Sequence, residues 1–309
     1  MKQLIYAAAL AILMVLALSP ATHAVDDPVR ITMAPISTSI ELQPNTRTVN
    51  SFDIYNSGEA PFRFSVYAQP YTVRNLRYDP VFDVEQPNTQ IRRWISFPRT
   101  TYELAPKHTV TVPYVITTPA TLPDGGQYAA IFAQTDGSTT DNLTTEKRVG
   151  MILYAHAKGK TRYAGTSQLD APPRLRTEAA YTMQTQLRNT GNVDFVVTTT
   201  LEIRRQTDNS LVYSHSLQKP IIPDTTRSIE LPWQGTTGLF DRYTVTQRVD
   251  YLGKHDTRTN TMIVVSPIFI PIGIAVTVGY FGILAWIVWL LIRRIRRHKH
   301  GEPKTPEVS

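Results

Sequence analysis

The sequence predicts an all-β protein with two tandem Ig-like β-sandwich domains and one C-terminal transmembrane helix. Short alternating runs broken by turn residues, the same turn signals repeated in the second half, and one long uncharged apolar segment indicate this. Period-two runs separated by Gly, Pro and Asn are typical of sandwiches, and long apolar runs are typical of membrane spans.

The N terminus has the features of a secretory signal peptide. Lys2 precedes an apolar run from Leu4 to Leu18, and small residues up to Ala24 follow it. A positive charge, a short apolar core and a small-residue cleavage site define such signals, and this run is short for a membrane span. We therefore expect residues 1–24 to be removed and the mature chain to be exported.

Residues 25–146 are predicted to form the first sandwich. Its clearest strand has one apolar face, made by Val110, Val112, Tyr114 and Ile116. Pro113 lies on the opposite face, and because proline has no backbone N–H it predicts a sheet edge or a bulge there. The polar stretch 136–146 is expected to be a loop.

The second half repeats the order of signals found in the first. The Asn-Ser-Gly turn at 56–58 has a counterpart in Asn-Thr-Gly at 189–191, and Leu-Ala-Pro at 104–106 matches Ile-Ile-Pro at 221–223. Repeated signals in one order indicate two copies of one fold. We predict a second sandwich at 179–266, with a strand and a linker at 147–178 that could belong to either domain.

The segment 268–292 contains no charged residue. As a helix it would extend about 37 Å, enough to cross a hydrocarbon core of about 30 Å. A cluster of basic residues follows it, namely Arg293, Arg294, Arg296, Arg297 and Lys299. Basic residues beside a span mark the cytoplasmic side, so we expect extracellular domains and a cytoplasmic tail at 293–309, in a single-pass protein of the cell membrane.

Composition argues against several functions. The formal net charge of +7 comes largely from the C-terminal tail, so no nucleic-acid partner is expected. The chain has no cysteine, so no disulfide is expected. Its histidines are scattered and no spacing suits a metal site, so we expect no metal and no cofactor. No nucleophile or phosphate-binding motif is present, and we therefore expect a protein that is not an enzyme.

Residues 31–133 contain Leu-Gln-Pro-Asn at 42–45, Tyr-Glu-Leu-Ala-Pro at 102–106 and Pro-Asp-Gly-Gly-Gln-Tyr at 123–128. With these motifs the first domain resembles the peptidoglycan-binding domain of bacterial WxL-interacting proteins, and the resemblance is weaker over 149–265. In that family the first Ig-like domain is followed by a second, partner-binding one and by a C-terminal anchor. The resemblance implies binding of peptidoglycan or another wall polymer at the cell surface.

Two aromatic and basic segments are candidate ligand-binding sites, comprising Tyr71, Arg74, Arg77 and Tyr78 in the first and Arg92, Arg93 and Trp94 in the second. Tyrosine faces stack on sugar rings, and Arg engages carboxylates and phosphates with paired hydrogen bonds. The alternative is that the polar residues are solvated and that Trp94 packs against a sheet.

These observations predict a membrane-anchored surface protein that binds peptidoglycan or a surface protein partner. The alternative is a membrane-anchored chaperone or assembly factor that lends a strand to exported subunits. An exposed sheet edge of alternating large apolar residues would favour that alternative.

Overall fold

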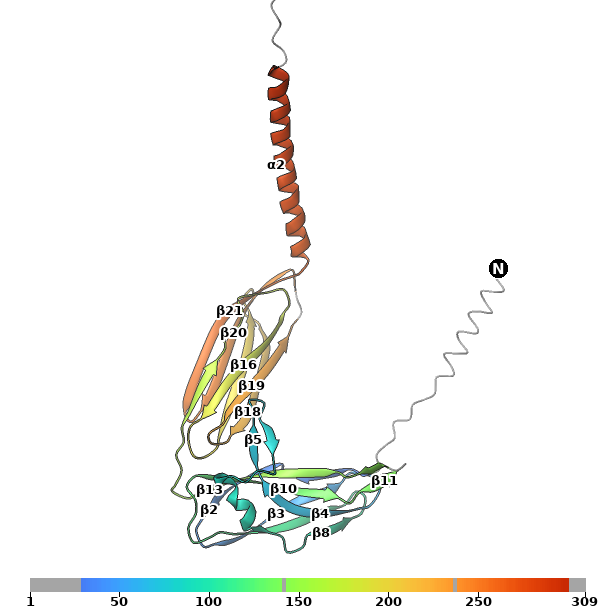
Figure 1. Ribbon diagram of the computed structural model, residues 1–309, viewed down its shortest axis with the longest axis vertical. Coiled ribbons are helices and arrows are strands. Elements are labelled where there is room, and N and C mark those ends of the chain that lie inside the picture. The colour runs from blue at the N-terminus through green and yellow to red at the C-terminus, as the bar shows by residue number, and fades with distance from the viewer. Residues whose placement is uncertain (1–28, 141–142, 236–237, 300–309) are drawn as a thin grey trace, which may run out of the picture. The chain divides into compact units, whose positions relative to one another are not determined.

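The computed structural model describes residues 29–140, 143–235 and 238–299, and the chain divides into two compact units (Figure 1). The first contains the described residues up to Thr72, together with Val81–Pro123 and Gln127–Lys158. The second contains Val73–Pro80, Asp124–Gly126 and the described residues from Gly159. Both are built from β-sheets, which confirms the predicted fold class. The predicted signal peptide lies outside the described residues.

The first unit is a sandwich of two sheets, with the strand orders β1-β3-β9-β7 and β2-β13-β10-β4-β8. The strands are β1 (Ile31–Ala34), β2 (Ser37–Leu42), β3 (Arg47–Asn56), β4 (Phe62–Pro70), β7 (Ile95–Ser96), β8 (Thr101–Leu104), β9 (Thr109–Thr117), β10 (Gly126–Thr135) and β13 (Arg148–Ala157). A 3-10 helix, η1 (Pro87–Trp94), precedes β7. A hairpin pairs β11 (Ser138–Thr140) with β12 (Leu143–Thr145), and a second hairpin, which pairs β5 (Thr72–Arg74) with β6 (Asp79–Val81), belongs mainly to the second unit.

The second unit has a similar strand arrangement, with the orders β14-β16-β19 and β15-β21-β20-β17-β18, although β7 of the first unit has no counterpart beside β19. The strands are β14 (Gly165–Leu169), β15 (Leu175–Arg176), β16 (Ala180–Asn189), β17 (Phe195–Arg205), β18 (Leu211–Ile221), β19 (Thr226–Gln234), β20 (Phe240–Tyr251) and β21 (Lys254–Val265). In each unit the first strand is divided between the sheets: β1 and β14 pair antiparallel with β3 and β16, whereas β2 and β15 pair parallel with β13 and β21. The matching orders confirm the predicted tandem repeat.

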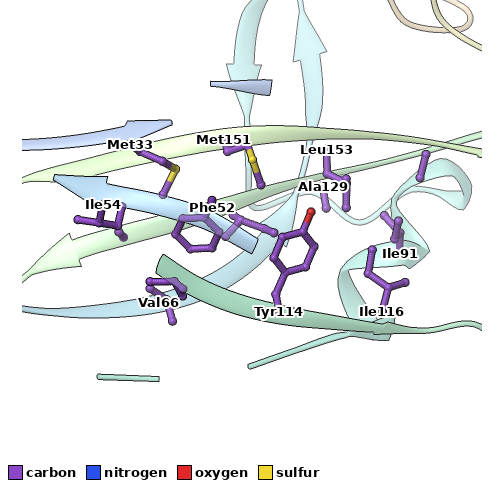
Figure 2. Close-up of a cluster of buried hydrophobic side chains, with 14 of the residues drawn as sticks. Met33, Phe52, Ile54, Val66, Ile91, Tyr114, Ile116, Ala129, Met151 and Leu153 are labelled. Carbon is purple, nitrogen blue, oxygen red and sulfur yellow. The ribbon is translucent and has the colours of Figure 1, made fainter. Parts of the chain in front are cut away.

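The core of the first unit lies between its two sheets, where side chains from both inner faces meet (Figure 2). The predicted apolar face of β9 points into it: Val112, Tyr114 and Ile116 are buried. Burial raises the pKa of Tyr114 to about 12.

The pairing of β9 with β3 continues without a shift through Pro113, and β7 joins the other side of β9 only at Val115 and Ile116. Pro113 therefore stands at a sheet edge, one of the two predicted possibilities.

The Asn turns of the repeat perform the same structural role in both units. The Asn56 amide donates to the Ala60 and Leu104 carbonyls at 2.9 and 3.3 Å and accepts from the Gly58 N–H at 3.0 Å. Asn189 makes the same three bonds, donating to Val193 and Ile221 at 2.7 and 2.8 Å and accepting from Gly191 at 2.8 Å.

Both asparagine side chains are fully buried. Each amide therefore ties the turn after one strand to the segment that precedes a later one, Leu104 in the first unit and Ile221 in the second. A buried amide needs these bonds, because unpaired polar groups are costly away from water.

Two sequence expectations about boundaries are wrong. The stretch 136–146 contains the β11–β12 hairpin and is not only a loop, because the threonines that are frequent in it favour strands. The stretch 147–178 begins with the expected strand, but the remainder is not only a linker. Its first part, β13, lies between β2 and β10 in the first sandwich, whereas β14 and β15 are strands of the second.

The C-terminal helix α2 runs from Phe269 to Lys299. Its segment Phe269–Arg294 has a mean hydropathy of 2.2 and is long and apolar enough to cross a membrane. The apolar side chains of the segment are exposed to the surroundings of the protein and are not packed in a core. This is the pattern of a candidate span, because a core helix would bury at least one face.

Candidate ligand-binding site

The structure buries the two tyrosines of the candidate segment at 71–78 and leaves its two arginines exposed. The segment contributes to the β5–β6 hairpin, and Tyr71 and Tyr78 are buried, at 6% and 7% exposure. Tyr71 packs in the first unit among aromatic rings, with centroids 6.1 Å from Phe82 and 6.3 Å from Tyr154. Its faces are therefore covered by protein and not open to a sugar ring.

Tyr78 belongs to the second unit, in which its hydroxyl joins the loop before β19. The hydroxyl accepts from the Ile222 N–H at 2.6 Å and shares a hydrogen bond with Thr225 at 2.7 Å, while the Arg227 guanidinium lies 4.3 Å from the ring centre. Arg74 and Arg77 of the same hairpin are exposed. The structure thus places the two tyrosines in different units and does not form one platform from them.

The second predicted segment is the end of η1. Arg92 and Arg93 are exposed and both pair with Glu85, Arg92 at 3.4 Å. Trp94 is partly buried and packs against the core of the first sandwich, as the alternative interpretation expected. The carboxylate of Glu85 already engages both guanidinium groups.

A surface that the sequence analysis did not identify lies at the end of the five-stranded sheet, where β8 is the terminal strand. The Val66 N–H donates to the Thr100 carbonyl at 2.9 Å, which continues the antiparallel register of Phe62 with Leu104 and Phe64 with Tyr102. Hydrogen-bonded and non-hydrogen-bonded pairs alternate in such a ladder. The N–H and C=O groups of Thr101 and Glu103 therefore point away from β4, toward the open edge.

A polar groove of about 500 Å³ lies beside this edge, lined by Arg63 of β4 and by residues 98–103. Arg99 is one of its lining residues, and its Nε–H donates to the outward-pointing Thr101 carbonyl at 2.6 Å. The same guanidinium lies 4.9 Å from the centre of the Tyr102 ring. A hydrogen bond and a cation–π contact therefore position Arg99 beside the groove.

Sequence reasoning could not find this groove, because the alternation of Tyr102 and Leu104 indicates a strand but not that the strand is terminal. The segment Arg-Thr-Thr-Tyr-Glu at 99–103 combines a basic and an aromatic residue, as the two candidate segments at 71–78 and 92–94 do.

Among the described residues, no group of three His, Cys, Asp or Glu side chains is placed to hold a metal ion.

Comparison with known proteins gives no family. No protein-family model and no curated protein match the chain. Among solved structures, it is similar to the E. coli chaperone DraB, with 10% identity over 76% of this chain and 98% of that chain and a TM-score of 0.38. A chain of the CsuC–CsuE chaperone–tip adhesion subunit complex of Acinetobacter baumannii has 10% identity over 74% and 97%, with a TM-score of 0.39. The PapD-like domain 7 of human CEP192 has 11% identity over 42% and 87%, with a TM-score of 0.29. These values are too low to transfer a function to this chain.

Proposed function

We propose that the protein is a non-enzymatic, membrane-anchored binding protein that captures an extended segment of an exported protein on the open edge of β8. The observation that carries this proposal is the outward direction of the main-chain groups of Thr101 and Glu103 beside a polar groove. The Thr101 carbonyl already accepts from Arg99 and has one further lone pair for a ligand N–H. An extended peptide can add a strand to such an edge, and the main-chain hydrogen bonds then supply affinity.

The burial of the apolar side chains of β8 bears on whether this edge receives a strand from a partner or lends one to it. Tyr102 and Leu104 face the core, at 6% and 4% exposure. The strand therefore has no large apolar side chains to insert into a partner, and it suits receiving a segment better than lending one. Both a lasting surface-protein partner and an exported subunit awaiting assembly fit this use.

Cell-wall glycan is the competing ligand, because residues 31–133 resemble a peptidoglycan-binding domain. That interpretation depends on the family resemblance, and the burial of Tyr71 and Tyr78 gives it no exposed pair of tyrosines for stacking on sugar rings. A polypeptide ligand is favoured because the exposed main-chain edge offers a strand's hydrogen-bonding pattern.

We further propose that α2 anchors the domains outside the cell, with the C terminus in the cytoplasm. The apolar segment Phe269–Arg294 and the basic residues at its end support this orientation. Protease added to intact cells, or to cells whose outer barrier is opened, should digest residues up to the span and leave a C-terminal epitope tag attached to a short protected fragment. Loss of the tag while the cytoplasmic membrane is intact would contradict this topology.

The binding edge can be tested by placing a photo-crosslinking residue at Thr101 of the full-length protein in its own cells. The control position is Val49, which is 61% exposed on β3 in the other sheet of the same unit. Polypeptide adducts are expected at position 101 and not at position 49, with the attachment sites mapped by mass spectrometry.

A second change tests whether main-chain pairing is responsible. Glu103→Pro removes an N–H that points away from β4, so it should abolish the adducts while leaving the β4–β8 ladder intact. Glu103→Ala keeps that N–H and should preserve them. Adducts that consist of glycan, or adducts that survive Glu103→Pro, would show that the proposed function is wrong.

A further inference from the structure

Two arginines, Arg63 and Arg99, line the groove beside β8. Arg63 of β4 stands opposite Glu103 of β8, and both side chains are exposed. Their neighbours Phe64 and Tyr102, which form the next pair, are buried in the core. Because side chains alternate between faces, Arg63, Thr101 and Glu103 lie together on the outer face beside the groove.

Of the two arginines, Arg99 has its guanidinium positioned by contacts with β8. Its Nε–H bond to the Thr101 carbonyl uses one of the five donors of a guanidinium. The Tyr102 ring beneath it stacks on Phe64 with centroids 5.3 Å apart and an interplanar angle of 15°. This rigid support reduces the ordering that binding would require and leaves further N–H donors for a ligand.

The other arginine, Arg63, forms an exposed ion pair that a ligand carboxylate can replace. It lies 3.7 Å from Asp136, and both side chains are more than half exposed. Exposed ion pairs of this kind contribute little to stability and are screened by salt. Arg63 can therefore leave Asp136 for another carboxylate at small cost.

A strand paired with the edge would place alternate side chains over this face. A residue opposite Glu103 would meet a negative charge, whereas a residue opposite Thr101 would lie beside Arg99. We propose that the groove receives one carboxylate side chain, Asp or Glu, of the captured polypeptide segment, with Arg99 as the first partner and Arg63 as the second. The inference rests on the proposed function and specifies the class of segment.

The test measures binding of three synthetic peptides to the full-length protein in detergent micelles by fluorescence anisotropy. Each peptide has nine residues of alternating threonine and valine, with Glu, Gln or Lys at the centre. The Glu peptide should bind roughly threefold to tenfold more tightly than the Gln peptide, since a charge-assisted bond replaces a neutral one, and the Lys peptide should bind most weakly. The advantage of Glu over Gln should shrink as salt is raised.

Variants assign the effect to the groove. Arg99→Gln should bring the Glu peptide close to the affinity of the Gln peptide, Arg63→Gln should do so in part, and Glu103→Ala should strengthen binding of the Glu peptide. The matched control is Arg47→Gln, which removes an exposed arginine of β3 in the other sheet and should change nothing.

The outcomes separate this inference from the proposed function. Equal affinity for the Glu and Gln peptides, in binding that Glu103→Pro abolishes, would overturn the acidic preference and leave edge capture standing. A Glu preference that persists in Arg99→Gln would also overturn it. Absence of binding by all three peptides, or binding unaffected by Glu103→Pro, would contradict both.

Discussion

Replacing Val112 by Asp is expected to unfold the first sandwich. Val112 is fully buried in β9, opposite Phe52, and is surrounded by the core residues of both sheets. A buried carboxylate without a partner costs several kcal/mol, against a total stability of about 5 to 15 kcal/mol for a typical domain. Amide hydrogen exchange followed by mass spectrometry should show loss of protection in the peptides that contain β3 and β9.

The matched control introduces the same residue on the opposite face of the same strand. Thr109 is exposed, so Thr109→Asp should leave protection in β9 almost unchanged. Thr111 is a poorer control, because its hydroxyl donates to Asp53 at 2.7 Å and a second carboxylate there would be repelled. Similar losses in Val112→Asp and Thr109→Asp would mean that the inner and outer faces of β9 have been misassigned.

Removing either repeated asparagine should destabilise its own sandwich strongly. Asn189→Ala leaves two buried carbonyls and one buried N–H without the side chain that now pairs with them, and Asn56→Ala leaves one buried carbonyl, one partly buried carbonyl and one buried N–H. Each orphaned group costs on the order of 1–3 kcal/mol, with partial relief from relaxation, so we expect a loss of about 2–4 kcal/mol in each variant. Urea titration monitored by hydrogen exchange in β4 and β17 would report the two units separately.

An exposed turn of similar chemistry provides the control for the asparagines. Asp208 accepts bonds from the Ser210 hydroxyl at 2.7 Å and from the Ser210 N–H at 3.0 Å, and these hold the pKa of its carboxyl below the ordinary value against a small opposing effect of burial. Water can replace these bonds when the side chain is removed, so Asp208→Ala should be much milder. If Asn56→Ala and Asn189→Ala were as mild, the buried amides would not hold the strand connections.

The candidate site was the part of the protein that the sequence predicted least well. Two tyrosines and two arginines at 71–78 suggested an exposed loop, yet the Tyr78 hydroxyl forms hydrogen bonds with Ile222 and Thr225, far along the chain. Such partners leave no periodic signal near Tyr78. The groove at β8 was missed for the same reason, since Arg63 and Arg99 are brought together only by the pairing of β4 with β8.

The residues alone predicted most strands of the two sandwiches, the inner face of β9, the tandem repeat and the apolar helix. These features have local signals: alternation at Val112, Tyr114 and Ile116 indicates a face, and the Asn-x-Gly turn occurs in both units. The residues did not predict that β13 lies in the first sandwich, that Tyr71 and Tyr78 are buried, or that β8 ends its sheet. Strand order depends on contacts between residues distant in the chain, and a strand's own residues do not specify which neighbour, if any, pairs with its second side.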